Sequence, residues 1–122
     1  MGLQFELLVL NNRRLIWEQL GLAPEDIICN NPFFQRPTQR HAGCQIDYMI
    51  QTRFNTIYIC EIKFSKSEIK SAVIEEVKEK ISSLSLPKHF SYRPVLIQVN
   101  GVSEEVGESG YFSSILNFGR WL

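Results

Sequence analysis

The sequence lacks the long apolar run, about 20 residues, that a membrane-spanning helix requires. Its amino terminus also lacks the basic region of a signal peptide, so we expect a soluble, cytoplasmic protein without membrane contact. None of the three cysteines forms a CxxC pair, which disfavours a zinc ribbon. Cys29, His41 and Cys44 could supply metal ligands, but free cysteines more commonly serve as small core residues.

An excess of charge of either sign is also missing, because 13 Lys and Arg residues balance 13 Asp and Glu residues. Proteins that bind nucleic acid regardless of its sequence are usually basic. The overall charge therefore gives no support for nucleic-acid binding, and such a function has to rest on local clusters. One cluster, with Arg36, Arg40 and His41, lies in a segment whose prolines and glycine predict a loop.

Length and composition predict one domain over residues 1–122, with 44% hydrophobic and 21% charged residues. Apolar residues recur at helical spacing over residues 3–20, where Gly21 is the predicted stop, and again from residue 67 until Pro87. Residues 26–29 predict a weak strand, and residues 44–51, 56–64 and 92–100 predict further strands. The acidic segment 103–110 is a predicted loop, and residues 111–122 a predicted helix. Helices bracketing a short mixed sheet give an α/β fold.

The stretch ICEIKF, residues 59–64, places a carboxylate and an ammonium in an otherwise apolar strand. Because side chains alternate across a strand, Glu61 and Lys63 share one face while the other face stays apolar. If residues 53–55 form the hairpin loop, Thr52 pairs with Thr56. Asp47 then lies opposite Glu61 on the same face.

Two carboxylates placed opposite each other normally destabilise a sheet. One interpretation is a charge network on a solvent-facing side of the sheet, which is the commoner situation for charged residues. The other is a divalent cation between Asp47 and Glu61, since Mg²⁺ prefers oxygen ligands. Lys63 would then stabilise negative charge on a phosphate, and Glu6 would complete the site directly or through water.

Asp47 followed by Glu61-Ile62-Lys63 resembles the core of the PD-(D/E)XK nuclease superfamily. In that superfamily an acidic residue on one strand and an acid-x-Lys on the next bind the metal. The element order also resembles its restriction-endonuclease-like αβββαβ core. Within the superfamily, the sequence most resembles the nuclease-like domain at the carboxyl end of certain prokaryotic AAA-type ATPases. The matching positions are Gly2, Phe5-Glu6, Asn12, Ile16, Leu20-Gly21, Gly43 to Asp47, Cys60 to Ser65, and Lys80.

The resemblance implies metal-dependent hydrolysis of phosphodiester bonds in nucleic acid, with DNA as the leading substrate. It implies Glu6, Asp47, Glu61 and Lys63 as catalytic residues. Glu6, Asp47, Glu61 and the backbone carbonyl of Ile62 would be ligands of Mg²⁺ or Mn²⁺. The residues proposed to contact phosphate are basic ones near the predicted strand ends, although each is more commonly plain surface charge: Arg36, Arg40, Lys66 and Lys70.

The sequence departs from the family pattern in two ways. Ile46 precedes Asp47 where the superfamily name has Pro, a change that the superfamily tolerates. No GxxxxGK[ST] motif is present, so an ATPase module would be a partner in the same longer protein or in another chain. The resemblance also implies a second copy of the chain as a partner, in a homodimer.

Two other functions stay open from the sequence. A binding or regulatory module with a nuclease-like fold and little turnover is favoured by the zero net charge. Retention of all four chemical positions favours the nuclease instead. A purely structural interaction protein is the third possibility, and it predicts no response to Mg²⁺.

Overall fold

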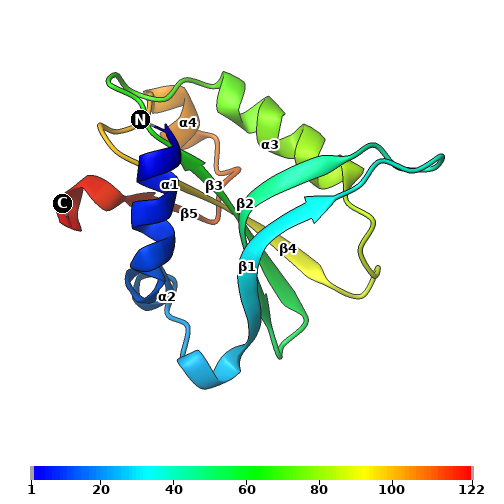
Figure 1. The fold of residues 1–122 in the computed structure, drawn as a ribbon. Helices are drawn as coiled ribbons and strands as arrows, with labels where there is room; N and C mark the ends of the chain where they lie inside the picture. Colours follow the sequence, from blue (N-terminus) through cyan, green and yellow to red (C-terminus); the bar gives the residue numbers. More distant parts are fainter. Residues whose placement is uncertain (1, 122) are drawn as a thin grey trace.

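A five-stranded mixed sheet forms the centre of the computed structural model, which describes residues 2–121 (Figure 1). The strands lie in chain order across the sheet. Strands β1 to β3 are antiparallel, and β4 and β5 run parallel to β3. The strand bounds are Ile27–Gln35 for β1, Cys44–Thr52 for β2, Thr56–Lys63 for β3, Ser91–Gln98 for β4 and Ser114–Asn117 for β5.

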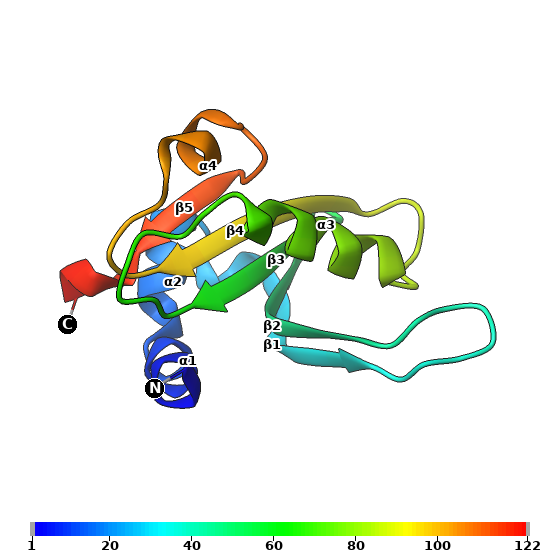
Figure 2. The same ribbon diagram turned by 90° about the horizontal axis from the view of Figure 1, so that it is seen from above.

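Helices cover both faces of the sheet (Figure 2). Helices α1 (Gly2–Asn11) and α2 (Arg13–Leu20) pack on one face, and α3 (Ala72–Ser83) packs on the other within the connection from β3 to β4. These features confirm the predicted α/β class and the order helix, three strands, helix, strand. Among residues 2–121, none of the helices combines the length and the apolar character that a membrane crossing requires.

The helix predicted over residues 3–20 is in fact two helices. Asn12 leaves the helical conformation, with φ −123° and ψ 34°, and its side-chain Nδ2 donates to the Leu8 carbonyl at 2.9 Å. A short amide side chain competes in this way with the helical hydrogen bonds. The break lets Val9 of α1 and Ile16 of α2 enter the same apolar core.

The first strand is longer than the sequence predicted. Residues 30–35, part of the segment 30–43 that its prolines and glycine predicted as a loop, belong to β1 and pair with β2. The strand tolerates a proline because β1 is at the edge of the sheet, where one row of backbone groups needs no partner. The loop is therefore confined to residues 36–43, beyond the ends of the two strands.

The predicted carboxyl-terminal helix is wrong. Residues 114–117 form strand β5, and a 3₁₀ turn follows at Phe118–Trp121. Within the acidic segment predicted as a loop, Glu104–Glu108 forms the short helix α4. Short apolar runs fit either helical or alternating spacing. Pairing with β4 decides for a strand, because it places Leu116 in the core under α1 and α2 and Ile115 beside the α3 core.

Candidate functional site

Strands β2 and β3 pair in the register that the sequence predicted. Thr52 ends β2 and Thr56 begins β3, so residues 53–55 form the loop, and pairing continues as far as Tyr48 opposite Cys60. Beyond that pair the two strands diverge, and β2 curves away from β3 (Figure 1). Asp47 is the first residue on the diverging side, so it does not form the direct cross-strand pair with Glu61 that we predicted.

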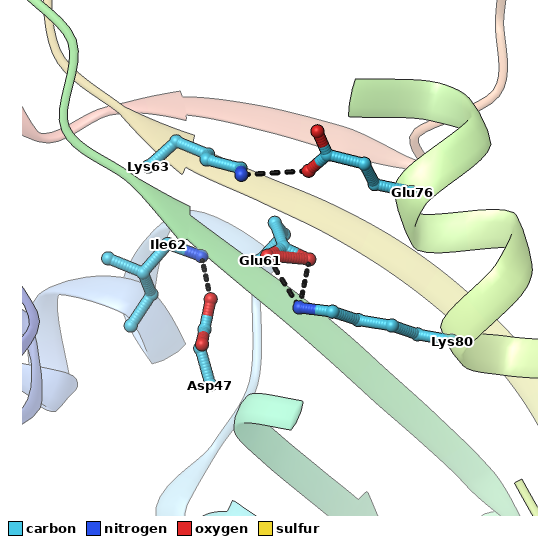
Figure 3. Close-up of polar contacts among 6 residues, drawn as sticks. All are labelled: Asp47, Glu61, Ile62, Lys63, Glu76 and Lys80. Atoms are coloured by element: carbon cyan, nitrogen blue, oxygen red, sulfur yellow. Dashed lines mark hydrogen bonds and ion pairs between the residues drawn. The ribbon is translucent and has the colours of Figure 1, made fainter. Parts of the chain in front are cut away.

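Asp47 reaches β3 through its side chain instead. Its Oδ2 accepts a hydrogen bond from the backbone N–H of Ile62 at 2.8 Å (Figure 3). The carboxylate thus takes over a donor that the diverging strand leaves without a backbone partner. This contact holds the Asp47 carboxylate beside the residue that follows Glu61.

Glu61 lies on the face of β3 that α3 covers, next to the core residues Ile57 and Ile59. It is only 5% exposed, and both of its carboxylate oxygens accept from Lys80 Nζ, at 2.9 and 3.0 Å. Burial raises the pKa of the Glu61 carboxyl, the bond from Lys80 opposes that rise, and the charge of Asp47 adds to it. A buried carboxylate of this kind needs its ammonium partner, because an unpaired buried charge is costly.

Lys63 shares the face of Glu61 but does not bond to it. Its ammonium lies 2.8 Å from Glu76 Oε2 on α3, and this bond raises the pKa of Lys63. Glu76 and Lys80 are one helical turn apart and therefore project from the same side of α3. Figure 3 shows the resulting two ion pairs side by side between strand and helix, in which each charge on β3 meets its opposite on α3.

An open cavity of about 620 Å³ lies beside these ion pairs. Glu6 from α1 and Asp47 from β2 both line it, although they are 41 positions apart in the sequence. Burial and the charge of Asp47 raise the pKa of Glu6, and the charge of Lys80 lowers it. The remaining lining residues come from α3, from the end of the loop before β2 and from the start of β2: Ala42, Gly43, Cys44, Gln45, Glu76, Glu79, Lys80 and Ser83.

The side chain of Gln35 holds one wall of this cavity in place. Its Nε2 donates to the carbonyl of Ser83 at 2.6 Å and to that of Ala42 at 2.9 Å, and its Oε1 accepts from Ser85 N–H at 2.8 Å. These bonds therefore link the end of β1 to the loop between β1 and β2 and to the carboxyl end of α3. The cavity lies between elements that these bonds keep at a defined separation.

The available donors suit a small hard cation by their chemistry. Asp47, Glu61, Glu6 and the Ile62 carbonyl offer the oxygen ligands that Mg²⁺ prefers. Even so, no three His, Cys, Asp or Glu side chains are grouped as a metal cage within residues 2–121. At Glu61 a cation would compete with the ammonium of Lys80, which bonds to both carboxylate oxygens. The same finding gives no support to a site built from the cysteines.

The basic residues proposed as phosphate contacts separate into two environments. Arg36 and Arg40 are exposed in the loop between β1 and β2, which projects beyond these strands (Figure 2). Residues 42 and 43 at the end of this loop line the cavity. Lys66 and Lys70 are exposed after β3. Lys70 lies 3.8 Å from Glu68 and lines a hollow with further glutamates from α4. The loop that carries the two arginines therefore has no acidic residue, whereas Lys70 has acidic neighbours.

Glu76 and Glu79 are the residues of this site that the sequence did not indicate, and Lys80 entered only as the late helical lysine of the family pattern. The available signal was a complementary spacing. Glu61 and Lys63 are two apart on a strand, and Glu76 and Lys80 are four apart on a helix. Such a signal becomes useful only once the strand and the helix are known to face each other.

No protein-family model matches the sequence, and the search of curated proteins finds no match. Among solved structures, the fold is similar to the crystal structure of a repair endonuclease from Pyrococcus abyssi. The TM-score is 0.51 at 17% identity, over 86% of this chain and 44% of that one. It is also similar to a protein of unknown function, AF1548, with a TM-score of 0.57 at 19% identity, over 93% of this chain and 55% of that one.

The chain thus spans about half the length of the two solved structures it matches. At identities of 17% and 19% the likeness concerns the fold alone. The five-stranded mixed sheet with helices on both faces is a nuclease-like fold, in the sense that it resembles the structure of an endonuclease.

Proposed function

We propose that this chain is a metal-dependent nuclease domain that hydrolyses phosphodiester bonds of nucleic acid, with DNA as the leading substrate. The observation that carries the proposal is the contact of Asp47 with the Ile62 N–H at 2.8 Å. It brings a carboxylate from one strand beside Glu61 on the next, at the point where the strands diverge. The likeness of the fold to a repair endonuclease supports the proposal.

In this proposal Asp47 and Glu61 hold Mg²⁺ or Mn²⁺, with Glu6 and the Ile62 carbonyl as further ligands. The ion, when bound, would orient the scissile phosphate and lower the pKa of the attacking water. The water oxygen bonds to phosphorus while the bond from phosphorus to the departing sugar oxygen breaks. Glu6 lines the same cavity, where it would orient that water while solvent takes up the proton that the water loses. Solvent protonates the departing oxygen.

Nucleic acid would approach along the loop that joins β1 and β2, residues 36–43. Arg36 and Arg40 are exposed there, and the loop leads into the cavity that Glu6 and Asp47 line. Arginine forms strong charge-assisted bonds with phosphate, which suits the projecting loop to holding a backbone. Lys66 and Lys70 are weaker candidates because Lys70 has acidic neighbours. An ATPase module and a second copy of the chain belong to the proposal as partners.

The test is a titration of Mg²⁺ and Mn²⁺ with labelled single-stranded and duplex DNA and RNA. We expect cleavage only with metal, and its loss by about 10²-fold or more in Glu61→Ala and Asp47→Ala. Glu68→Ala, an exposed carboxylate after β3, is the matched control and should cleave normally. Cleavage that survives in Glu61→Ala, or no cleavage of any substrate with metal, contradicts the proposal.

A binding module with little turnover is the second candidate. It is favoured by the zero net charge and by the ammonium of Lys80 on both oxygens of Glu61, which balances that buried charge without any metal. Such a module would bind its ligand, a partner protein or a nucleic acid, equally well in the presence of a chelator. Glu61→Ala would then leave both binding and the absence of cleavage unchanged.

A further inference from the structure

The two lysines beside Glu61 occupy different positions relative to the cavity. Lys80 lines the cavity together with Glu6 and Asp47, whereas Lys63 is not among its lining residues. The ammonium of Lys63 is held by Glu76, 2.8 Å away. Lys63, the lysine of the acid-x-Lys pattern, is therefore paired with α3. Lys80 of α3 lies instead beside Glu61, in the position that we expected for Lys63.

Lys80 and a cation would compete for Glu61. The carboxylate is 5% exposed, and its two oxygens are already bonded to one ammonium. A divalent ion bound there would repel the ammonium strongly, because charges a few Å apart interact strongly when water is largely excluded. The Lys80 side chain is 30% exposed and has a long flexible stem, so its ammonium can move without displacing α3.

If the ammonium of Lys80 leaves Glu61, it remains beside the open cavity, because Lys80 already lines that cavity. The acidic side chains of Glu76 and Glu79 line it as well. Figure 3 shows Lys80 extending from α3 across to Glu61 on the strand. A phosphate that approaches Asp47 and Glu6 would meet the ammonium in this same cavity.

We infer that Lys80, rather than Lys63, is the catalytic ammonium that contacts the phosphate, and that it occupies the place of the metal ion at Glu61 until metal binds. This inference rests on the proposed nuclease function and adds a residue to it. Lys80 stabilises negative charge on the phosphate oxygens and transfers no proton. Lys63 is a positioning residue that docks α3 through Glu76.

The first test measures metal binding without substrate. Mn²⁺ alone is titrated at about pH 8, well above the ordinary carboxyl range, and free ion is followed by electron paramagnetic resonance. Because the competing ammonium is gone, Lys80→Met should bind Mn²⁺ about tenfold more tightly than wild type. Lys78→Met, an exposed lysine on the same helix, is the matched control and should equal wild type.

The second test measures cleavage at saturating metal. Lys80→Met should lower kcat by about 10²-fold, the scale for loss of one group that stabilises a transition-state charge. Lys63→Met should lower it less, and Lys80→Arg should retain part of the rate. Opposite changes in metal affinity and kcat distinguish this role from a structural one, which would weaken both. Lys80→Gln, which keeps a donor for Glu61, replaces Lys80→Met if circular dichroism shows that the latter is unfolded.

The outcomes separate this inference from the proposed function. If wild type cleaves and Lys80→Met cleaves equally well, while Lys63→Met does not, the inference is wrong and the nuclease function stands. If Lys80→Met binds Mn²⁺ no more tightly than wild type, Lys80 does not compete with the metal ion for Glu61, whether or not any substrate is cleaved. If wild type cleaves nothing, the nuclease function and the catalytic role fail together.

Discussion

Strand β3 has one face that is apolar and one that is charged at its end. Cys60 and Ile62 point into the core under α1 and α2, where Phe5 and Val9 are also buried. Glu61 and the partly buried Lys63 point toward α3 and meet opposite charges. Alternation along one strand is enough to separate these environments. A single short segment can therefore support the core and present a polar site.

The two faces also differ in what holds them. Under α1 and α2 the contacts are mainly apolar, as in the packing of Phe118 against Phe5 and Trp121. At the charged end of the α3 face, stability depends on specific partners, since each buried or half-buried charge needs its opposite. We therefore expect substitutions on the first face to cost most in stability, and substitutions on the second to act most on metal binding and chemistry.

The largest expected effect is on the apolar face. Phe118→Ala removes a buried ring that contacts two aromatic neighbours, and it should lower the free energy of unfolding by about 3–5 kcal/mol. Urea denaturation measures this change. Phe54→Ala, a ring that is 62% exposed in the hairpin loop, is the control and should have little effect. Equal losses in the two variants would contradict the assignment of the core.

On the charged face, Lys80→Met should lower the free energy of unfolding by about 1–3 kcal/mol, because Glu61 is left buried without its donor. If Mg²⁺ binds the folded site as proposed, it should raise the melting temperature of this variant more than that of wild type. Scanning calorimetry with and without Mg²⁺ measures both. An equal response of the two proteins to Mg²⁺ would show that the ion does not use Glu61.

A polar contact within the apolar face gives a smaller effect. The buried Tyr48 hydroxyl donates to Asn30 Oδ1 and accepts from Trp17 Nε1, both at 2.9 Å. Tyr48→Phe removes both bonds and should cost about 1–2 kcal/mol at neutral pH, with denaturant titration as the measurement.

The same residue predicts a pH dependence. Burial raises the pKa of Tyr48 from 10.0 to about 12. The folded state therefore holds its proton more tightly than the unfolded state, and the contribution is fully present below about pH 10 and lost as the pH rises toward 12. Tyr48→Phe does not titrate, so the stability difference between wild type and variant should shrink over this window. A difference that stays constant would contradict the burial of the hydroxyl.

The smallest expected effect is at the outer ion pair. Lys63 and Glu76 are each at least one-third exposed, and such pairs contribute about 0–1 kcal/mol. Glu76→Gln should therefore change the urea midpoint only slightly, and the change should diminish at high salt. A loss as large as that of Lys80→Met would show that the two ion pairs do not differ in the way that their burial indicates.

Local patterns predicted the hairpin of β2 and β3 better than they predicted the rest of the fold. The three-residue loop at residues 53–55 and the register that it sets through Tyr48 and Cys60 are both confirmed. The helix break at Asn12 and strand β5 were missed. In both cases the apolar spacing fits more than one conformation, and packing against the sheet decides between them.

What the sequence determined by itself is the alternation of β3, the face that Glu61 and Lys63 share, and the strand from which Asp47 approaches. These depend only on chain geometry over a few residues. Tertiary structure alone decided that Asp47 bonds to a backbone N–H, that Lys63 meets Glu76 and that Lys80 meets Glu61. These choices depend on where β2 diverges and how α3 docks, and both follow from packing between distant segments that no local pattern records.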